Sequence, residues 1–476
     1  MPTPSPSPLR WRALVALAAA QFLIIMDTSI IGVALPDMQT SLGFDPDDLS
    51  WVFNAYVIAF GGLLLLGGKL SDIFGARRVF TAGFWILTVA SVAAGVAQTP
   101  AVEIAARAGQ GVGAALIAPA SLTLLISLFG SDQRELGKAL AIYGAAAPAG
   151  GTAGVFLGGV LTEWLDWPWV FYVNVPIGLA VLAVTPRLLP RSARVPGKVD
   201  VVGGLTITGA LTLGVLAIVR APEIGWSSAG TLATAIVATA LLLAFIAIQT
   251  FRSDPLVPLA IFRVPGLAAS NVVMALLGAA WVPMWFFLNL YLQQVLEFSP
   301  FAAGSSLLPM TVLMMVLMVG VTERLVTRFT PKPVLVSGLA VLAVGLGMLT
   351  GVTAGGSFLD DVLAGSLVAA VGMSLAYIPA MMSALAGAGP ANAGLASGIV
   401  NSTYQIGSAL GLAVMTAVAT SAGADQLGDP AALTDGYAAA FMGATAIAVA
   451  AAVVAAALLG RRRTPIATTP ELTPVG

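Results

Sequence analysis

The sequence of 476 residues contains no cysteine and no histidine. Without cysteine the chain has no disulfide, no thiolate metal site and no cysteine nucleophile. Without histidine, proton transfer near neutral pH must use carboxyl groups, because imidazole is the side chain that normally titrates there. We expect neither a bound metal nor a cofactor.

Charged residues are also scarce. They make up 9% of the chain, against roughly 25% in a typical soluble domain, while 58% of the residues are hydrophobic and the mean hydropathy is +0.96. So few charges cannot cover a surface that faces water, which argues against a soluble enzyme and a disordered scaffold. The net charge of −1 offers no attraction to nucleic acid. The composition indicates a polytopic membrane protein.

Apolar runs long enough to cross a bilayer recur along the whole chain. The hydrocarbon core is about 30 Å thick, which a helix of roughly 20 residues spans. Each run is expected to be helical, because a segment in lipid must satisfy its own backbone hydrogen bonds. We predict fourteen spans, over residues 12–35, 49–70, 79–98, 101–129, 137–161, 169–189, 201–219, 229–251, 266–293, 301–322, 333–351, 359–386, 393–421 and 434–459.

The basic residues support this count. When the fourteen spans are threaded through a membrane, all of the 21 lysines and arginines except Arg107 and Arg220 fall on one side. The positive-inside rule then predicts an even number of spans with both termini in the cytoplasm. The opposite side holds Asp45, Asp47, Asp48, Asp166, Asp360, Asp361, Asp425 and Asp429.

The segment GKLSDIFGARR stands between the second and third spans. Its pattern G-x-L-x-D-x-x-G-x-R-R resembles the signature of the major facilitator superfamily. We expect Gly68 to allow close helix packing and Gly75 to permit a tight turn. Asp72 can accept hydrogen bonds from a helix N-terminus or pair with an arginine, which makes it, with Arg77 and Arg78, a candidate gating motif. The alternative is an ordinary basic loop.

Span 1 contains one carboxylate, Asp27, within MDTSIIGVALP. This stretch resembles the first-span signature of the fourteen-span drug:proton antiporter branch, although Ser29 and Gly32 stand where threonine and asparagine are usual. A carboxylate near the middle of a membrane helix costs about 2.5–3.5 kcal/mol on insertion scales, so Asp27 should face an aqueous cavity or a partner. We expect it to load and release protons; the alternative is a static ion pair.

Span 4 contains RAGQGVGAA, which begins at Arg107 and matches the R-x-x-Q-G-x-G-A-A pattern of the family. Arg107 keeps its proton, so it is a fixed positive charge. Near Asp27 it would favour the ionised carboxylate, and moving away would favour proton uptake. Glu103 lies one helical turn earlier, and two roles are open for it: a second titrating group, or a salt bridge with Arg107 at the helix end.

Span 5 reads GAAAPAGGTAGVFLGG and resembles the antiporter motif of the drug-exporting branch. Gly150, Gly154 and Gly158 recur every four residues and, with Gly159, predict a smooth face for a neighbouring helix. The Gly-Pro pair that is usual in this motif is missing, since Val155 follows Gly154. A packing face and a special role in antiport are both open.

Together the resemblances run from residue 26 to residue 414. They imply an all-α integral membrane protein with the major facilitator fold: two six-helix bundles plus two extra central helices, fourteen transmembrane helices in all. The expected organisation is a disordered cytoplasmic tail over 1–11, an N-terminal bundle over 12–189, a linker with spans 7 and 8 over 190–265, a C-terminal bundle over 266–459 and a cytoplasmic tail over 460–476.

A substrate site is expected in the cavity between the two bundles. Such a cavity should be largely apolar with few polar groups if the substrates are varied amphiphiles. Side chains at helical spacing in spans 9 and 13 are the candidate contacts; the alternative is that they face lipid or pack helices. These candidates are Trp281, Trp285, Asn289, Asn401, Tyr404 and Gln405.

The resemblance implies a proton-coupled antiporter that exports amphiphilic drugs or antibiotics from the cytoplasm by alternating access. We expect a monomer in a bacterial cell membrane, with small amphiphiles and protons as its partners. An exporter dedicated to one endogenous metabolite, a self-resistance pump, fits the sequence as well. A membrane-embedded enzyme is disfavoured by the lack of a paired acidic motif on one face. The phosphate-binding pattern GxxxxGK[ST] is also absent, which excludes ATP-driven transport by this chain.

Overall fold

The computed structural model describes residues 9–46, 48–129, 133–190, 200–252, 255–263, 266–385 and 389–459. Within these residues the chain is built from helices and contains no strand. In the described part of the chain, fourteen helical segments are long and apolar enough to cross a membrane, as the apolar runs predict. The predicted tails fall largely outside the described residues, and the first helix already begins at Leu9.

The first half of the chain forms six spans, and the first of these is bent. The sequence predicts one helix over 12–35, but the helix breaks at Ile30 and continues to Leu42. The hydroxyls of Thr28 and Ser29 both donate to the carbonyl of Ile25, a contact that bends helices. The helices of this half are α1 (Leu9–Ser29), α2 (Ile31–Leu42), α3 (Trp51–Phe74), α4 (Ala76–Gly95), α5 (Pro100–Phe129), α6 (Gln133–Trp164), α7 (Trp169–Tyr172) and α8 (Asn174–Leu188), with a short turn η1 (Asp48–Ser50).

The second half forms another six spans. Several of them are continued by short π-helical turns, which occur often where a helix adapts to its surroundings. The helices are α11 (Leu267–Leu290), α12 (Pro300–Ser306), α13 (Leu308–Gly320), α14 (Thr322–Phe329), α15 (Pro331–Leu349), α16 (Ala364–Leu385), α17 (Gly389–Ala419) and α18 (Pro430–Leu458), with the turns η3 (Tyr291–Val295), η4 (Phe358–Leu363) and η5 (Thr420–Ala424).

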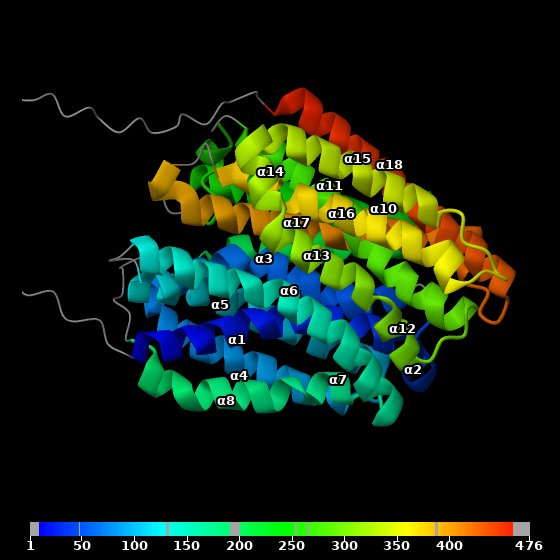
Figure 1. Ribbon diagram of the computed structural model, residues 1–476, viewed down its shortest axis with the longest axis horizontal. Helices are drawn as coiled ribbons and strands as arrows, with labels where there is room; N and C mark the ends of the chain where they lie inside the picture. Colours follow the sequence, from blue (N-terminus) through cyan, green and yellow to red (C-terminus); the bar gives the residue numbers. More distant parts are fainter. Residues whose placement is uncertain are drawn as a thin grey trace, which may run out of the picture.

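Figure 1 shows the two halves as separate bundles lying side by side, the first in blue to blue-green and the second in green to red. Two extra helices, α9 (Val201–Ile224) and α10 (Ala229–Phe251), connect them, followed by the turn η2 (Leu259–Arg263). Helix α9 packs on α3 and on α17, while α10 packs on α9. Asp200 stabilises the contact between α9 and α10. Its carboxylate accepts hydrogen bonds from the Gly203 amide and from Gln249 and lies 3.3 Å from Arg252.

The two ends of the molecule differ in charge. At the end where α1 begins and α18 finishes, hereafter the basic end, the described basic side chains are Arg10, Arg12, Lys69, Arg77, Arg78, Arg187, Arg252, Arg263, Arg324, Arg328 and Lys332. The opposite end, hereafter the acidic end, contains α2, α7 and α12 (Figure 1). Its described acidic side chains include Asp45, Asp166, Asp360, Asp361, Asp425 and Asp429.

Close packing of α3 on α5 depends on Gly67 rather than on Gly68. A Cβ added to Gly67 would lie 2.0 Å from the carbonyl oxygen of Ala115, whereas one on Gly68 would meet nothing closer than 3.7 Å. The prediction that Gly68 provides the close approach is therefore wrong by one position, because a step of one residue turns a helix face by about 100°. Gly75 has φ +90° at the α3–α4 turn, which favours glycine.

The glycines of α6 form a continuous contact face. Added Cβ atoms on Gly150, Gly154 and Gly158 would lie 2.5, 2.8 and 2.7 Å from carbonyl oxygens of the first span, and one on Gly159 would lie 2.8 Å from Pro300 of α12. Helix α6 thus touches its own bundle with three glycines and the other bundle with the fourth. The motif lies at a joint between the two halves.

Candidate functional site

A buried ion pair lies inside the N-terminal bundle. The Asp27 carboxylate at the end of α1 accepts a hydrogen bond of 2.8 Å from Nη1 of Arg107 on α5. Both side chains are 0% exposed. Gln110 on α5 and Asn174 at the start of α8 also donate to the Asp27 carboxylate, the former at 3.0 Å. Three donor side chains therefore converge on one carboxylate, which replaces the hydration that the charge loses on burial.

Arg107 is held by more than its carboxylate partner. Its Nε donates to the Val52 carbonyl at 2.9 Å, and its Nη1 also donates to the side chain of Gln110 at 2.7 Å. The guanidinium carbon lies 4.6 Å from the centre of the Tyr56 ring, within the range of a cation–π contact. The guanidinium thus links α5 to α1 and α3, while its Nη2 has no hydrogen-bond partner among the described residues.

Glu103 lies one turn from Arg107 but does not pair with it. The Glu103 side chain is 0% exposed, and neither carboxylate oxygen has a hydrogen-bond partner within the described residues. The predicted helix-end salt bridge with Arg107 is therefore absent, because that guanidinium is already directed toward Asp27 and Val52. A buried carboxyl group without a partner is costly when ionised, which leaves the titrating role open for Glu103.

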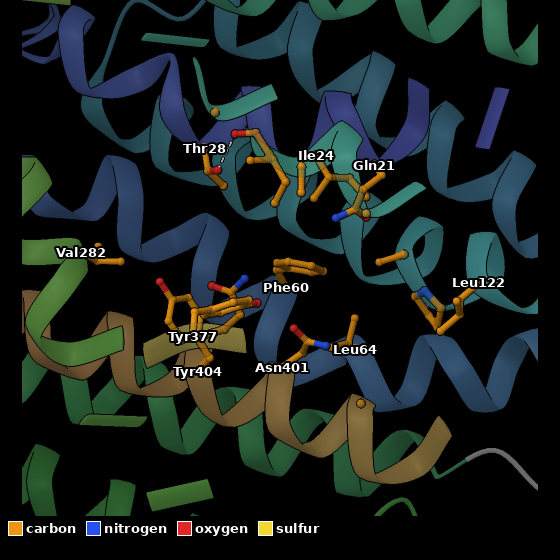
Figure 2. A pocket seen from close by; sticks show the side chains of 18 of the residues that line it. Gln21, Ile24, Thr28, Phe60, Leu64, Leu122, Val282, Tyr377, Asn401 and Tyr404 are labelled. Carbon is orange, nitrogen blue, oxygen red and sulfur yellow. Dashed lines mark hydrogen bonds between the residues drawn. The ribbon is translucent and has the colours of Figure 1, made fainter. Parts of the chain in front are cut away.

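A cavity of about 1570 Å³ lies between the two bundles. In Figure 2, Gln21 and Thr28 of α1 face Tyr377 and Tyr404 of the C-terminal bundle, with Phe60 between them. Tyr377 and Tyr404 pack edge to face, with ring centres 5.6 Å apart. The cavity is large enough for a drug-sized molecule.

All six predicted substrate contacts line this cavity: Trp281, Trp285, Asn289, Asn401, Tyr404 and Gln405. Asn289 is 1% exposed, and its Oδ1 has no hydrogen-bond partner among the described residues. The contribution of the N-terminal half was not predicted; it includes Gln21, Thr28 and Phe60.

Asp27 does not line the cavity. The cavity-lining residues of α1 include Ile24, Ile25 and Thr28, while Asp27 points to α5 and α8. Of the two predicted surroundings for Asp27, an aqueous cavity and a partner, the structure has the partner. One face of α1 therefore borders the cavity and another holds the ion pair.

At the acidic end, hydrogen bonds join the two halves. Gln293 of η3 donates to the Val33 carbonyl of α2 at 2.9 Å, and Gln294 donates to the side chain of Gln39 at 2.9 Å. On α6, Glu163 accepts hydrogen bonds from Ser299 and from the Phe301 amide. We call these contacts the acidic-end gate.

The cavity extends in the other direction to the basic end. Its lining there includes Lys69, Ile126 and Val326, together with Pro255 and Pro258 from the connection between α10 and α11. Arg77 in the predicted gating motif donates to the Leu189 carbonyl at 3.1 Å and so ties the start of α4 to the end of α8. Arg78 is exposed, and the side chain of Asp72 lies outside the described part of the chain.

Gln110 and Asn174 were not predicted as site residues. Gln110 is the glutamine of the R-x-x-Q-G pattern, three residues from Arg107, and Asn174 is an amide within an apolar span. An amide in a membrane helix normally has a polar partner, and this signal was available in the sequence. Both side chains also reach Ser91 of α4, Gln110 at 2.9 Å and Asn174 at 3.5 Å.

Several bacterial proteins are similar in sequence. The cephamycin export protein CmcT of Amycolatopsis lactamdurans is 40% identical over 446 residues, which cover 93% of this chain and 91% of that protein. The puromycin resistance protein pur8 of Streptomyces alboniger is 37% identical over 467 residues, with 95% and 91% coverage. The tetracenomycin C resistance and export protein of Streptomyces glaucescens is 32% identical, with 85% and 75% coverage.

The fold also matches solved structures. A point mutant of the nucleoside transporter NupG superposes with a TM-score of 0.68 at 14% identity, over 95% of this chain and all of that one. The peptide transporter POT in complex with sulfate gives a TM-score of 0.68 at 15% identity, over 94% of each chain. The sequence model of the Major Facilitator Superfamily matches residues 17–411. The chain is thus a multi-pass membrane protein that belongs to the major facilitator superfamily.

Proposed function

We propose that the protein is a proton-coupled antiporter that exports amphiphilic drugs or antibiotics by alternating access. The observation that carries the proposal is the arrangement of a large cavity between two bundles beside a buried Asp27–Arg107 pair. The relatives whose names describe antibiotic export or resistance support the substrate class. The protein acts on its cargo by moving it, without chemical change.

The basic end faces the cytoplasm in this proposal, so both termini are cytoplasmic and the membrane is a bacterial inner membrane. The concentration of basic side chains at that end supports this orientation under the positive-inside rule. The cavity then opens toward the cytoplasm, with the acidic-end gate closed. This is the state that loads substrate, and one chain acts as a monomer.

Helix α1 couples protons to transport. Asp27 and the cavity residue Thr28 are adjacent on this helix, so a change in the hydrogen bonds of Asp27 shifts the cavity wall. Protonation of Asp27 removes its charge and weakens its contact with Arg107. The first span is then freed to move against α5, and the protonated outward-facing state can return to the state that faces the cytoplasm.

Glu103 serves as a second proton site on the route to Asp27. It lies near the start of α5, toward the acidic end, and within electrostatic range of Asp27 and Arg107. A proton that enters from outside the cell therefore meets Glu103 before it meets Asp27. The fixed charge of Arg107 expels the proton when the cavity faces the cytoplasm.

The two glycine-containing motifs act at the joints of the rocking movement. Gly68, Asp72, Gly75, Arg77 and Arg78 form the gate at the basic end. Gly150, Gly154, Gly158 and Gly159 let α6 slide on the first span and on α12, because small residues keep backbones close without interlocking side chains.

The test of coupling uses inside-out membrane vesicles. Respiration acidifies their interior, and an exporter then accumulates its substrate there. Replacing Asp27 with asparagine keeps the shape and removes the proton-binding group, so uphill accumulation should fall by at least tenfold while the amount of inserted protein is unchanged. An uncoupler should reduce the wild type to the same level.

Asp27→Glu and Asp425→Asn are the matched controls. The first retains a carboxyl group and should keep part of the uphill transport; the second removes an exposed carboxylate at the acidic end and should leave transport intact. Undiminished accumulation by Asp27→Asn vesicles would refute the coupling role of Asp27.

A dedicated exporter of one endogenous metabolite is the second candidate. It is favoured by the relatives that are named for single antibiotics, cephamycin and puromycin. A toxicity panel in a pump-deficient bacterial host separates the two: resistance to several unrelated amphiphiles supports the broad exporter, and resistance to one compound class supports the dedicated pump.

A further inference from the structure

The side chain of Asn289 lies where the two halves meet at the acidic end of the cavity. Asn289 on α11 and Gly32 on α2 both line the cavity, and a Cβ added to Gly32 would lie 2.9 Å from Nδ2 of Asn289. One helical turn further along the chain, Gln293 donates to the carbonyl of Val33, the residue that follows Gly32. The Asn289 amide therefore lies beside the acidic-end gate and is covered by α2.

The orientation of this amide is fixed by its own helix. Its Nδ2 donates to the Trp285 carbonyl at 2.9 Å, so an amide turned by 180° would place one oxygen against another. The Oδ1 atom of Asn289 is sealed from solvent and has no hydrogen-bond partner among the described residues. A buried acceptor without a donor is unfavourable, so the closed gate keeps Asn289 in an unfavourable state.

A second asparagine on α11 shows which contact Asn289 lacks. Nδ2 of Asn271 donates to the carbonyl four residues earlier, that of Leu267, at 2.8 Å, which is the same type of bond that Asn289 makes to Trp285. The Oδ1 atom of Asn271 also accepts a hydrogen bond of 2.9 Å from the hydroxyl of Thr403 on α17. Asn289 thus has the arrangement of Asn271 without the donor, and its side chain borders the cavity.

We infer that Asn289 accepts a hydrogen bond from an N–H or O–H group of the substrate, and that this bond forms when the acidic-end gate opens. This inference rests on the proposed export function and names the chemical class of the substrate and the residue that recognises it. While the gate is closed, α2 covers the amide at Gly32. Movement of α2 away from α11 uncovers Oδ1 of Asn289 toward the cavity.

Such a bond lets the substrate drive the opening. A ligand shifts a conformational equilibrium only by the difference in its affinity for the two states. The aromatic lining, which includes Trp281 and Trp285, contacts amphiphiles of every kind, but the bond to Asn289 forms in the open state alone. An amphiphile without a donor displaces water from this end of the cavity and leaves Oδ1 unpaired, which opposes opening.

Two coumarins that differ in one group test the inference. At pH 7 both are neutral; 7-amino-4-methylcoumarin has N–H donors, and 7-(dimethylamino)-4-methylcoumarin has none. Because the chain contains no cysteine, spin labels can be attached after Thr40→Cys and Gln426→Cys, which change exposed positions at the acidic end of different halves. Double electron–electron resonance in nanodiscs then measures the distance across the gate.

At saturating probe, we expect the amino compound to give at least threefold more of the long-distance, open-gate population than the dimethylamino compound. No proton gradient is needed, because the measurement is made at equilibrium. Equal populations with the two probes, whether or not both of them bind, overturn the inference.

Replacing the acceptor tests whether Asn289 is responsible. Asn289→Leu removes the amide at nearly unchanged volume, so the two probes should give equal open-gate populations. Asn271→Leu is the matched control, since it removes an asparagine with the same backbone contact from the same helix, and it should keep the threefold difference. A difference that survives Asn289→Leu, or that Asn271→Leu also abolishes, contradicts the role of Asn289.

A change on the opposite half tests the same arrangement with Asn289 intact. The added Cβ of Gly32→Ala would lie 2.9 Å from Nδ2 of Asn289, so the amide or α2 must shift and the direction of Oδ1 is lost. The difference between the probes should fall by at least half. Gly151→Ala adds the same group elsewhere in the cavity wall, where the nearest atom is 3.7 Å away, and should preserve the difference. A full difference in Gly32→Ala would contradict the inferred geometry.

Failure of the inference and failure of the proposed function are separable. Gradient-dependent export of both coumarins is measured in inside-out vesicles, whereas the distance across the gate is measured without a gradient. If the amino probe opens the gate and neither probe is exported, the inference holds and the export proposal fails. If both probes are exported and open the gate equally, the export proposal holds and the inference fails.

Discussion

The two bundles share one architecture but place charge differently. Asp27, Glu103 and Arg107 are fully buried in the N-terminal bundle, whereas no described Asp, Glu, Lys or Arg of the C-terminal bundle is buried. The C-terminal bundle instead supplies aromatic and amide side chains to the cavity, among them Trp285 and Tyr404. One half thus holds the ionisable network and the other holds much of the apolar and amide lining.

Because of this division, the coupling between proton and substrate is mechanical in our proposal. The buried ion pair and the cavity contact different faces of α1, and they share no side chain. The two sites therefore communicate through the position of that helix. Breaking the ion pair and changing the packing of each half are the direct ways to test the comparison.

The largest expected effect comes from Arg107→Leu. It leaves the Asp27 carboxylate buried without its cationic partner, which destabilises a protein by about 3–5 kcal/mol. We expect a large fall in the midpoint of thermal unfolding, followed in detergent by size-exclusion chromatography with fluorescence detection. A variant as stable as the wild type would show that the ion pair does not stabilise the fold.

A double variant separates stability from function. Asp27→Asn combined with Arg107→Gln removes both charges, so it should recover most of the stability lost in Arg107→Leu. It should still lack uphill export, because no proton-binding group remains at Asp27. Arg220→Gln, at an exposed position on α9, is the control for loss of an arginine. If Asp27→Asn with Arg107→Gln transported uphill, Asp27 would not be the coupling residue.

The next effect concerns a glycine that allows two helices to pack closely, a feature that both halves have. A Cβ on Gly67 would lie 2.0 Å from the Ala115 carbonyl oxygen, and one on Gly407 would lie 2.1 Å from that of Ala275. Alanine at either glycine forces two helices apart, and overpacking of this kind costs about 1–3 kcal/mol. We expect Gly67→Ala and Gly407→Ala to lower the thermal midpoint to a similar extent.

Two other helical glycines, one in each bundle, provide the controls. A Cβ on Gly68 meets nothing closer than 3.7 Å, and one on Gly320 meets nothing within 4 Å. Alanine there keeps the gain in helix propensity, which is up to about 1 kcal/mol, without a clash. Gly68→Ala and Gly320→Ala should therefore be neutral or slightly stabilising. A loss confined to one bundle would show that the halves do not rely on the same packing.

Much of this fold could be predicted from the sequence. Length, hydropathy and the placement of basic residues determine the number of spans, because lipid leaves few alternatives for a buried backbone. The break at Ile30 could not be predicted from the apolar run, since it depends on how the hydroxyls of Thr28 and Ser29 bond. The first helix is therefore bent, and α2 continues it to Leu42, beyond the membrane-spanning segment Leu9–Ser29.

Part of the candidate site could be predicted, because a buried charge in a membrane span favours a partner of opposite charge. A lone carboxylate and a lone arginine in two membrane spans favour each other, and Asp27 and Arg107 do meet. Which amides complete the pair depends on helix rotation, so Gln110 and Asn174 emerge from the structure. The same reason explains Glu103, whose expected salt bridge is prevented by the direction of the arginine side chain.

The smallest expected effect belongs to an acid outside the membrane-spanning segments. Partial burial raises the pKa of Asp37 in α2, and the nearby charge of Asp166 raises it further. In the pH window above the ordinary aspartate pKa of about 3.9, the folded protein therefore holds more protons at Asp37 than the unfolded chain. By linkage, the free energy of unfolding falls as pH rises through that window.

Asp37→Asn removes this titration, because the amide stays neutral at every pH. The variant should match the wild type in acid and become slightly more stable toward neutral pH, by up to about 0.5 kcal/mol, the usual range for a partly exposed position. Thermal midpoints measured from pH 4 to pH 8 check this, with Asp425→Asn as the control at an exposed site. Parallel pH profiles for Asp37→Asn and the wild type would show that the charge of Asp37 does not oppose the closed acidic end. The contrast between the two halves would then rest only on the ionisable groups that are buried inside the N-terminal bundle.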